Sequence, residues 1–231
     1  MITIRRFSTR VALWLAVVWA IAYYLGRTWG STRQERTRRL PGDGLVPNPA
    51  MVGDHAITIN ATPDDVWPWL AQMGWHRGGW YTYRWVDRLL FPQNPASAER
   101  ILPEFQELHV GDRIPDGPPE RGCFFVVEEL RAGHHLVLRS TTHLPPQLVN
   151  KKGVSMNWTW AFVIEPEGEA RTRFHFRWRG EARPLWLRLI YQALVMPADF
   201  VMGRSMCLGL KKRVEASRGR STSEPATVRR A

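Results

Sequence analysis

The feature that most limits the fold is a pair of neighbouring segments, NWTWAFVIE and RTRFHFRWRGE, with large apolar residues at every second position. In an extended strand, alternate side chains point to the same face. One face therefore collects Trp158, Trp160, Phe162, Ile164, Phe174, Phe176 and Trp178. The opposite face of the second segment collects Arg173, His175, Arg177 and Arg179. A Pro-Glu-Gly-Glu turn joins the two, so the pattern predicts an antiparallel hairpin with one buried and one wet face.

An apolar partner for the buried face follows further along the chain, at residues 197–218. Its apolar residues recur at steps of three and four and share one side of a helix: Phe200, Gly203, Cys207, Leu210 and Val214. Pro197 suits the first helical turn and Asp199 suits its positive end, with PLWLRLIYQALVM as a separate helical segment before them. We therefore expect an α+β fold in which a curved antiparallel sheet wraps around a long C-terminal helix, with a pocket between them.

The other elements fit the same architecture. A short strand is expected at His55–Asn60, followed by a helix that Thr62 caps, that has Pro63 at its first position and that ends at Gly74. A second short helix is expected over Tyr83–Phe91. From about Val110 the pattern becomes β, with a hairpin formed by CFFVVEEL and HHLVLRST.

The N-terminus carries an uncharged apolar run, Val11–Gly26, behind three arginines. Its 16 residues are short of the roughly 20 that span a bilayer, although aromatic residues after it extend it into the interface. A cleaved signal peptide is the main alternative, but no small-x-small cleavage site follows. We interpret residues 11–26 as an uncleaved membrane anchor. More arginines follow the run than precede it, which favours a cytoplasmic domain.

The remaining chain divides by composition. We expect a membrane anchor at 1–30, a linker rich in Pro and Gly at 31–53, a folded domain at 54–217 and a disordered basic tail at 218–231. The net charge of +11 suits an anionic surface. Because the basic residues flank an apolar segment and no nucleic-acid-binding motif is present, a membrane is the expected partner rather than nucleic acid.

No motif fixes a catalytic chemistry. The sequence has no nucleophile elbow, phosphate-binding loop or zinc-ligand spacing, so no catalytic residue, metal or cofactor is predicted. Cys123 and Cys207 have no CxxC spacing and are expected to be buried thiols. Four side chains could serve in acid–base chemistry without any readable pairing: Asp87, Glu104, His109 and His143.

Four blocks in order resemble the SRPBCC superfamily, the START-like and polyketide cyclase-like helix-grip proteins. They are ITINATPDDVWPWLAQMG, GGWYTYRWVDRLL, AERILPEFQELHVGD and MPADFVMGRSMCLGLKKRVE, within Asp54–Ser217. Relatives often carry an acidic residue where this chain has Arg84. The resemblance implies a helix-grip fold and a hydrophobic ligand, such as a lipid, sterol or polyketide, held between sheet and helix. It implies no fixed catalytic set.

We expect large rings and thioethers to line that cavity. The candidate ligand-binding residues are Trp69, Tyr81, Tyr83, Phe125, Trp158, Trp160, Phe174, Phe176, Phe200 and Met206. The favoured function is a membrane-anchored binding protein for a hydrophobic small molecule or lipid. Two alternatives stay open: a cyclase- or dehydratase-like enzyme using the same cavity, and a non-catalytic adaptor at the membrane surface.

Overall fold

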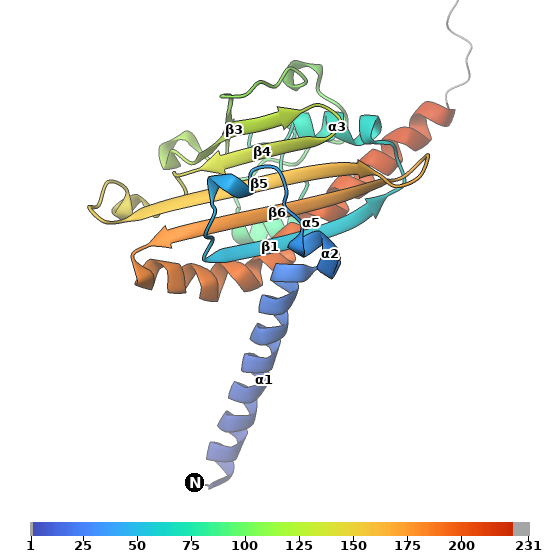
Figure 1. Ribbon diagram of the computed structural model, residues 1–231. Helices are drawn as coiled ribbons and strands as arrows, with labels where there is room; N and C mark the ends of the chain where they lie inside the picture. The colour runs from blue at the N-terminus through green and yellow to red at the C-terminus, as the bar shows by residue number, and fades with distance from the viewer. Residues whose placement is uncertain (1, 224–231) are drawn as a thin grey trace, which may run out of the picture.

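One six-stranded antiparallel sheet and one long helix form the body of the protein. The computed structural model describes residues 2–223. Its strands are β1 (Met51–Ile59), β2 (Arg113–Pro115), β3 (Phe124–Arg131), β4 (His135–Ser140), β5 (Ser155–Pro166) and β6 (Thr172–Arg183), in the spatial order β1-β6-β5-β4-β3-β2 (Figure 1). Its α-helices are α1 (Ile2–Thr28), α2 (Arg33–Thr37), α3 (Pro63–Ala71), α4 (Arg84–Leu90) and α5 (Leu185–Ser223).

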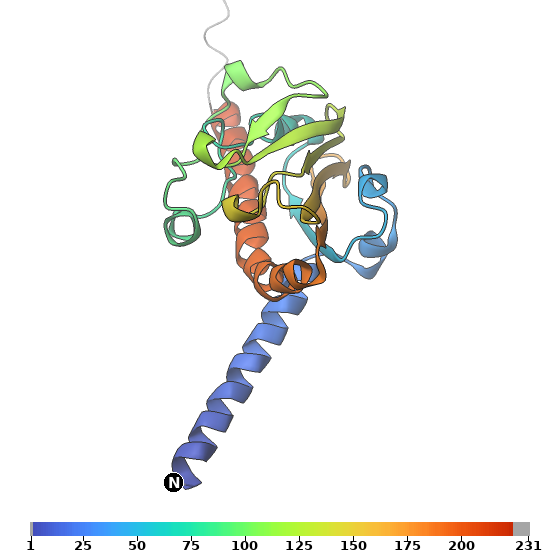
Figure 2. The ribbon, with the colours of Figure 1, turned by 90° about the vertical axis from the view of Figure 1, so that its left-hand side faces the viewer.

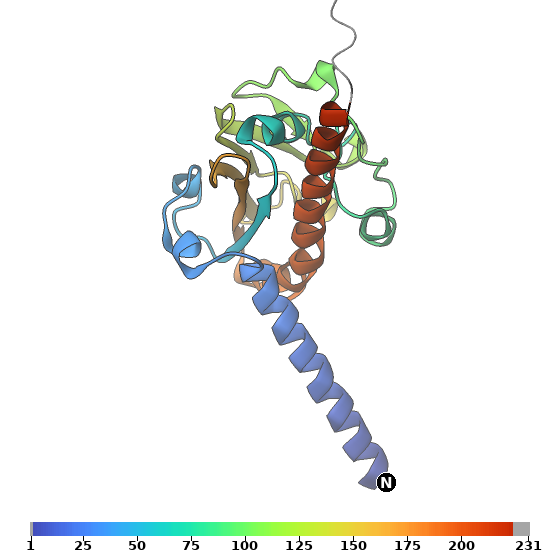
Figure 3. The same ribbon diagram turned by 90° about the vertical axis from the view of Figure 1, so that its right-hand side faces the viewer.

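The curved sheet packs around the C-terminal part of α5, which is the arrangement predicted from the sequence (Figures 2 and 3). The helix-grip fold is therefore confirmed. The expected start of α3 is also found: Thr62 accepts a hydrogen bond from the N–H of Asp65, whose carboxylate accepts one from the N–H of Thr62 in return. This reciprocal capping satisfies two N–H groups that the first turn leaves unpaired. The helix ends at Ala71, three residues before the predicted Gly74.

The inner face of the sheet carries the predicted aromatic rows. Trp158 stacks on Trp178 at 4.7 Å between ring centroids, and Phe162 stacks on Phe176 at 5.0 Å. Trp178, Phe162 and Phe176 are buried because the strands place alternate side chains toward α5. Offset stacking of such pairs adds about 0.5–1.5 kcal/mol each beyond the area that they bury.

The outer face of β6, predicted to be wet, is covered instead. Arg177 is buried and donates to Asp54 on β1 at 2.7 Å and to Asp43 at 2.9 Å. It also donates to backbone carbonyls at Glu35, Arg36 and Arg38. The segment before β1 thus folds back over the sheet, because its carbonyls and carboxylates supply acceptors that the arginine needs once it is out of water.

Residues 31–53, predicted as a linker, are consequently packed on the domain. They include α2, and β1 begins at Met51 rather than at the expected Asp54. Arg173 donates to both carboxylate oxygens of Glu35, at 2.7 and 3.0 Å. Although burial alone would raise the pKa of Glu35, the hydrogen bonds with Arg173 lower it from 4.5 to about 2. The predicted disordered tail begins within α5, and residues 224–231 lie outside the described part of the chain.

Pro197 does not start the long helix, as the sequence pattern suggested, because α5 is continuous from Leu185. The helix changes direction in its middle, so its first part runs along the base of the domain and the rest rises behind the sheet (Figures 1 and 2). A proline inside a helix removes one backbone hydrogen bond and bends the axis. The bend lets one helix serve both as the gripped core helix and as the base of the domain.

The end of α1 is built into the domain. The N–H of Ala56 donates to the carbonyl of Trp29 at 3.1 Å, and Trp19 donates from its indole to the carbonyl of Ala193 at 2.9 Å. Gly26 lies directly against α5, and a Cβ there would collide with the carbonyl oxygen of Met196. Helices approach this closely only where one of them lacks a side chain. The glycine therefore fixes where α1 crosses α5.

Candidate functional site

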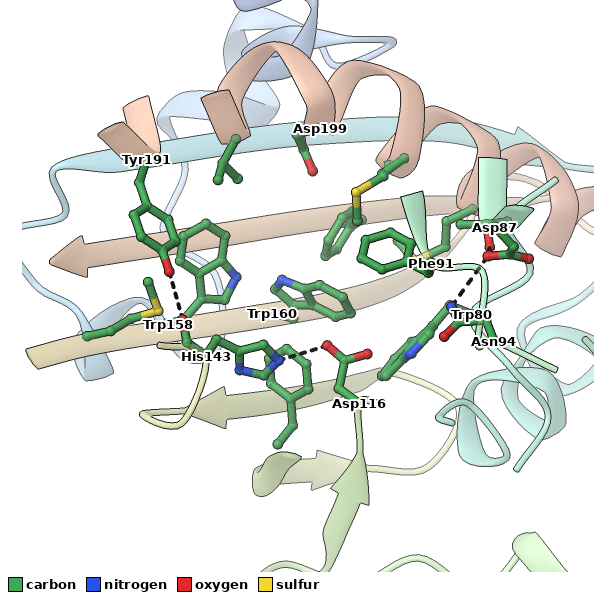
Figure 4. Close-up of a pocket in the computed structure, with 18 residues that line it drawn as sticks. Trp80, Asp87, Phe91, Asn94, Asp116, His143, Trp158, Trp160, Tyr191 and Asp199 are labelled. Carbon is green, nitrogen blue, oxygen red and sulfur yellow. Dashed lines mark hydrogen bonds and ion pairs between the residues drawn. The ribbon is translucent and has the colours of Figure 1, made fainter. Parts of the chain in front are cut away.

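A cavity of about 200 Å³ lies between the inner face of the sheet and α5 (Figure 4). α4 and the loops after β2 and β4 close its sides. Its apolar lining is Trp80, Phe91, Phe125, Met156, Trp158, Trp160, Phe176, Val195, Met202, Gly203 and Met206, and its polar lining is Thr82, Asp87, Asn94, Asp116, His143, Tyr191 and Asp199. A mostly aromatic wall with a few polar groups is the usual composition of a small-molecule site.

Trp160 on β5 forms the centre of the wall. Its ring is 4.5 Å from that of Phe125, 5.1 Å from that of Trp80 and 5.5 Å from that of Phe176, with the last two in edge-on geometry. The side chains of Met202 and Met206 on α5 complete the lining. Rings that fix one another in this way give the cavity a defined shape, and the thioethers can adapt to a ligand.

One end of the cavity holds a histidine between a carboxylate and a hydroxyl. His143 Nε2 lies 2.7 Å from Asp116 Oδ2, and its Nδ1 lies 2.6 Å from the Ser140 hydroxyl. Tyr191 donates from its hydroxyl to the His143 carbonyl at 2.8 Å. Burial raises the pKa of Tyr191, which keeps its hydroxyl protonated as a donor. These bonds fix both the ring and the backbone of His143.

The same contacts restrict the proton positions on this imidazole. A carboxylate accepts only, so Nε2 carries a proton toward Asp116 whenever Asp116 is ionised. Thr142 Oγ1 donates to the Phe124 carbonyl, and Ser140 lies within 3.0 Å of that hydroxyl. Ser140 can therefore donate to Nδ1 or accept from it, since Thr142 offers Ser140 a second acceptor. Both ring nitrogens thus have a polar partner at the cavity wall, which is the placement that a proton-transfer group requires.

The other end of the cavity holds Asp87 on α4, buried with only 3% of its surface exposed. Thr82 donates to its Oδ1 at 2.5 Å, and the amide of Asn94 lies 3.4 Å from the same atom. Between the two ends, Asp199 points from α5 into the cavity (Figure 4). Its Oδ2 accepts from His55 Nε2 and from the Trp178 indole, both at 2.6 Å. The cavity thus offers carboxylates at several points around an aromatic wall.

Half of the predicted ligand-binding residues line this cavity: Phe125, Trp158, Trp160, Phe176 and Met206. The other predicted residues serve the core or its edge. Tyr81 is fully buried and donates to the Trp69 carbonyl at 2.7 Å, and Phe174 stacks on Phe162. Tyr83 precedes α4 as its N-cap residue, and Phe200 lies on α5 beside Gly26.

The contact between Asp116 and His143 carried no signal in the sequence. The two residues belong to loops 27 positions apart, and the pairing of β2 with β3 and of β3 with β4 brings these loops together. Of the four acid–base candidates, Asp87 and His143 line the cavity, whereas Glu104 and His109 do not. Asp199, assigned to a helix N-terminus, lies inside α5 instead. Cys207 is buried as expected, while Cys123 is half-buried beside the His143 loop.

Within the part of the chain that the structure describes, no group of three His, Cys, Asp or Glu side chains could hold a metal ion. The carboxylates of the cavity are spread around it and are engaged with hydroxyl, indole or imidazole donors. The site is therefore suited to binding through apolar contact and hydrogen bonds.

No family model matches the chain, and the search of curated proteins finds no match. Among solved structures, a hypothetical protein from Helicobacter pylori is 13% identical with a TM-score of 0.46, covering 76% of this chain and 95% of that one. A Mesorhizobium loti protein is 13% identical with a TM-score of 0.43, covering 72% and 98%. Norcoclaurine synthase from Thalictrum flavum, in complex with dopamine and hydroxybenzaldehyde, is 16% identical with a TM-score of 0.40, covering 72% and 87%. The helix-grip assignment accordingly rests on the strand order and on the position of α5 in this protein.

Proposed function

We propose that this protein binds a hydrophobic small molecule or lipid in the cavity between the sheet and α5, and that α1 anchors it in a membrane. The observation that carries the proposal is the aromatic cavity of about 200 Å³, since a filled core would leave no such space. Its polar groups suit a ligand with an apolar body that donates hydrogen bonds, because Asp87, Asp116 and Asp199 supply acceptors.

The anchoring part of the proposal rests on α1. By length and composition, Arg10–Thr28 can cross a membrane, and only 6% of this stretch is buried inside the protein. A signal sequence would pass the same test. However, the Gly26 carbonyl lies 3.0 Å from His55 Nε2 inside the domain, and the Trp29 carbonyl pairs with β1. Cleavage after these residues would remove part of the fold, which supports a retained anchor; the arginines that follow the apolar run favour a cytoplasmic domain.

The test is native mass spectrometry with solvent extraction on the full chain in detergent. The full chain is needed because residues 26–47 pack on the sheet and cannot be removed without exposing it. Met202→Trp places an indole into the cavity, and we expect the bound ligand to be lost while the fold is kept. Lys212→Trp adds the same side chain on an exposed position of α5 and should leave the ligand bound.

Two results would overturn the binding proposal. One is a wild-type protein that carries no extractable apolar molecule and takes up no nile red. The other is equal ligand binding in Met202→Trp and in wild type. An empty protein that still localises to membranes would point to the adaptor function instead.

A second candidate function, acid–base catalysis of the cyclase or dehydratase kind, is favoured by one observation. Asp116 and Ser140 hold His143 in the cavity wall with both ring nitrogens engaged. In that case wild type should carry product and His143→Gln should carry substrate when both are expressed in the same host. The extracted molecules would then differ in mass or retention time. Identical molecules from both proteins would exclude a catalytic role for His143.

A further inference from the structure

The first ten residues of α5 expose an apolar surface that the ligand cavity does not explain. Five large side chains here are about half or more exposed: Leu185 57%, Trp186 47%, Leu189 53%, Ile190 46% and Leu194 65%. At 100° per residue they fall on one side of the helix. The opposite side packs on the domain, since Leu187 is buried, Val195 lines the cavity and Gln192 donates to the Ala50 carbonyl at 2.8 Å. The exposed side therefore remains as a contiguous apolar face, of the kind that marks a contact with a protein or a membrane.

This outer surface is continuous with α1. The Trp19 indole donates to the Ala193 carbonyl, and Gly26 fits against Met196, so α1 leaves the domain beside the exposed face of α5. Beyond that crossing, α1 exposes Leu15 at 65% and Val18 at 56%. Figure 1 shows the first part of α5 across the base of the domain, at the level where α1 leaves it. Together the two helices form an apolar patch much larger than isolated surface residues make.

The length of α1 that lies against α5 matches the depth at which an interfacial helix is buried in a membrane. Trp19 and Gly26, which mark the crossing, are about 10 Å apart along α1 at 1.5 Å per residue. Amphipathic helices in a membrane interface bury their apolar face by about 5–10 Å. Arg183 ends β6 just before the exposed stretch, Arg188 lies within that stretch, and Arg27 lies near the end of α1. Arginines at such an edge meet anionic headgroups favourably.

We propose that residues 185–194 of α5 lie in the interface of the bilayer that α1 enters, with Trp186, Leu189 and Leu194 in contact with lipid. This inference rests on the proposed anchoring by α1. α5 does not form a second span, because Cys207, Leu210 and Val214 in its C-terminal half are fully buried in the grip of the sheet. A second copy of the chain would cover the same face without needing the nearby arginines or the continuity with α1.

The arrangement places the cavity directly above the lipid. Tyr191 and Val195 line the cavity from the inner side of the same turns whose outer side carries Ile190 and Leu194. One helix therefore separates the ligand site from the bilayer. A ligand dissolved in the membrane would reach the cavity by passing the edge of this helix, so membrane lipid and lipid-soluble small molecules are the ligand class that the geometry favours.

The test is depth-dependent quenching on the full chain in vesicles of phosphatidylcholine and phosphatidylglycerol that contain brominated phosphatidylcholine. Leu189→Cys is labelled with an NBD fluorophore in a Cys123→Ser background; Cys207 can stay, because it is fully buried and burial raises the pKa of its thiol. Leu13→Cys in α1 is the positive control. Glu169→Cys, in the turn between β5 and β6 away from α1, is the negative control (Figure 1). We expect quenching at 189 that approaches quenching at 13 and is absent at 169.

The outcomes separate the two proposals. Quenching at 13 without quenching at 189 would overturn the interfacial position of α5. A blue-shifted but unquenched label at 189, with a doubled mass in detergent, would assign the face to a second copy and overturn the proposal as well. Ligand uptake is measured independently: quenching at 189 in a protein that binds no ligand would refute the proposed function and leave the membrane contact standing.

Discussion

Removal of the Asp199 carboxylate should destabilise the protein by an amount that the structure fixes. Asp199 Oδ2 accepts two buried donors, His55 Nε2 and the Trp178 indole, each at 2.6 Å. A hydrogen bond to a charged group contributes about 1.5–3 kcal/mol, so the two together contribute about 3–6 kcal/mol. The Asp199 side chain is 12% exposed at the cavity, and the Gly26 carbonyl also lies 3.0 Å from His55 Nε2, so entering water and this carbonyl would satisfy part of the lost bonding. We therefore expect Asp199→Ala to lower the free energy of unfolding by about 2–4 kcal/mol.

The assay is thermal unfolding of the full chain in detergent, followed by near-ultraviolet circular dichroism at a fixed scan rate. For a chain of this length, 1 kcal/mol corresponds to about 2–4 °C in Tm, so a loss of 3 kcal/mol would lower Tm by about 6–12 °C. Trp178→Phe removes one of the two donors and should lower the stability by about 1.5–3 kcal/mol. Glu169→Ala, on an exposed turn, is the control and should change it by less than about 0.5 kcal/mol.

The double variant decides whether the bond itself is responsible. If Asp199 and Trp178 act through one hydrogen bond, the combined loss must be smaller than the sum of the two single losses by about 1–2 kcal/mol. Fully additive losses would refute the proposed role of this hydrogen bond. An Asp199→Ala variant with the same Tm as the Glu169→Ala control would refute it as well. Additive losses would mean that Asp199 and Trp178 stabilise the fold independently, and an unchanged Asp199→Ala would mean that water or a rearranged side chain replaces the carboxylate at no cost.

Three further predictions concern the edges of the fold. Because the folded-state pKa of Glu35 is lowered from 4.5 to about 2, its pairing with Arg173 stabilises fully above pH 4.5, and this contribution is lost as pH falls toward 2. After allowance for solvent screening, wild type should lose on the order of 1 kcal/mol more than Glu35→Gln over that range in acid titrations. Gly26→Ala should cost about 1–3 kcal/mol in thermal unfolding, because its methyl group collides with the Met196 carbonyl; an unchanged Tm would contradict the crossing. Burial raises the pKa of Cys123 above 9.0, so alkylation should accelerate only at a higher pH than for a free thiol.

The inner face of the sheet was predictable because its signal is local. The two-residue period of Trp158, Trp160 and Phe162 reports which side is buried, whatever covers that side. The outer face was not predictable for the same reason. His175 and Arg177 have the same period, but their burial depends on Asp43 and on a backbone segment about 140 residues away. Nothing in a strand pattern states that a distant segment will supply acceptors.

The cavity shows the same division. Its rings lie at alternating strand positions, so Trp160 and Phe176 could be found from the sequence. Its polar groups come from α4 and the chain on either side of it, from α5 and from the loops after β2 and β4, and each is an ordinary polar residue when seen alone. Similarly, Pro197 has the sequence signature of a helix start. The chain continues the helix through it, since packing against α1 and the sheet offsets the lost backbone bond.

The crossing of α1 and α5 also removes degrees of freedom. A domain joined to its anchor by a flexible linker samples many tilts and heights above a bilayer. It must adopt one of these orientations each time it contacts the membrane surface. Here the Gly26 carbonyl, the Trp29 carbonyl and the Trp19 indole tie the helix to the core without any slack between them. If α1 anchors the domain in a bilayer, the fold therefore fixes the tilt and height of the domain above the membrane. The orientational entropy that a flexibly tethered domain loses when it meets the membrane surface is then lost already during folding.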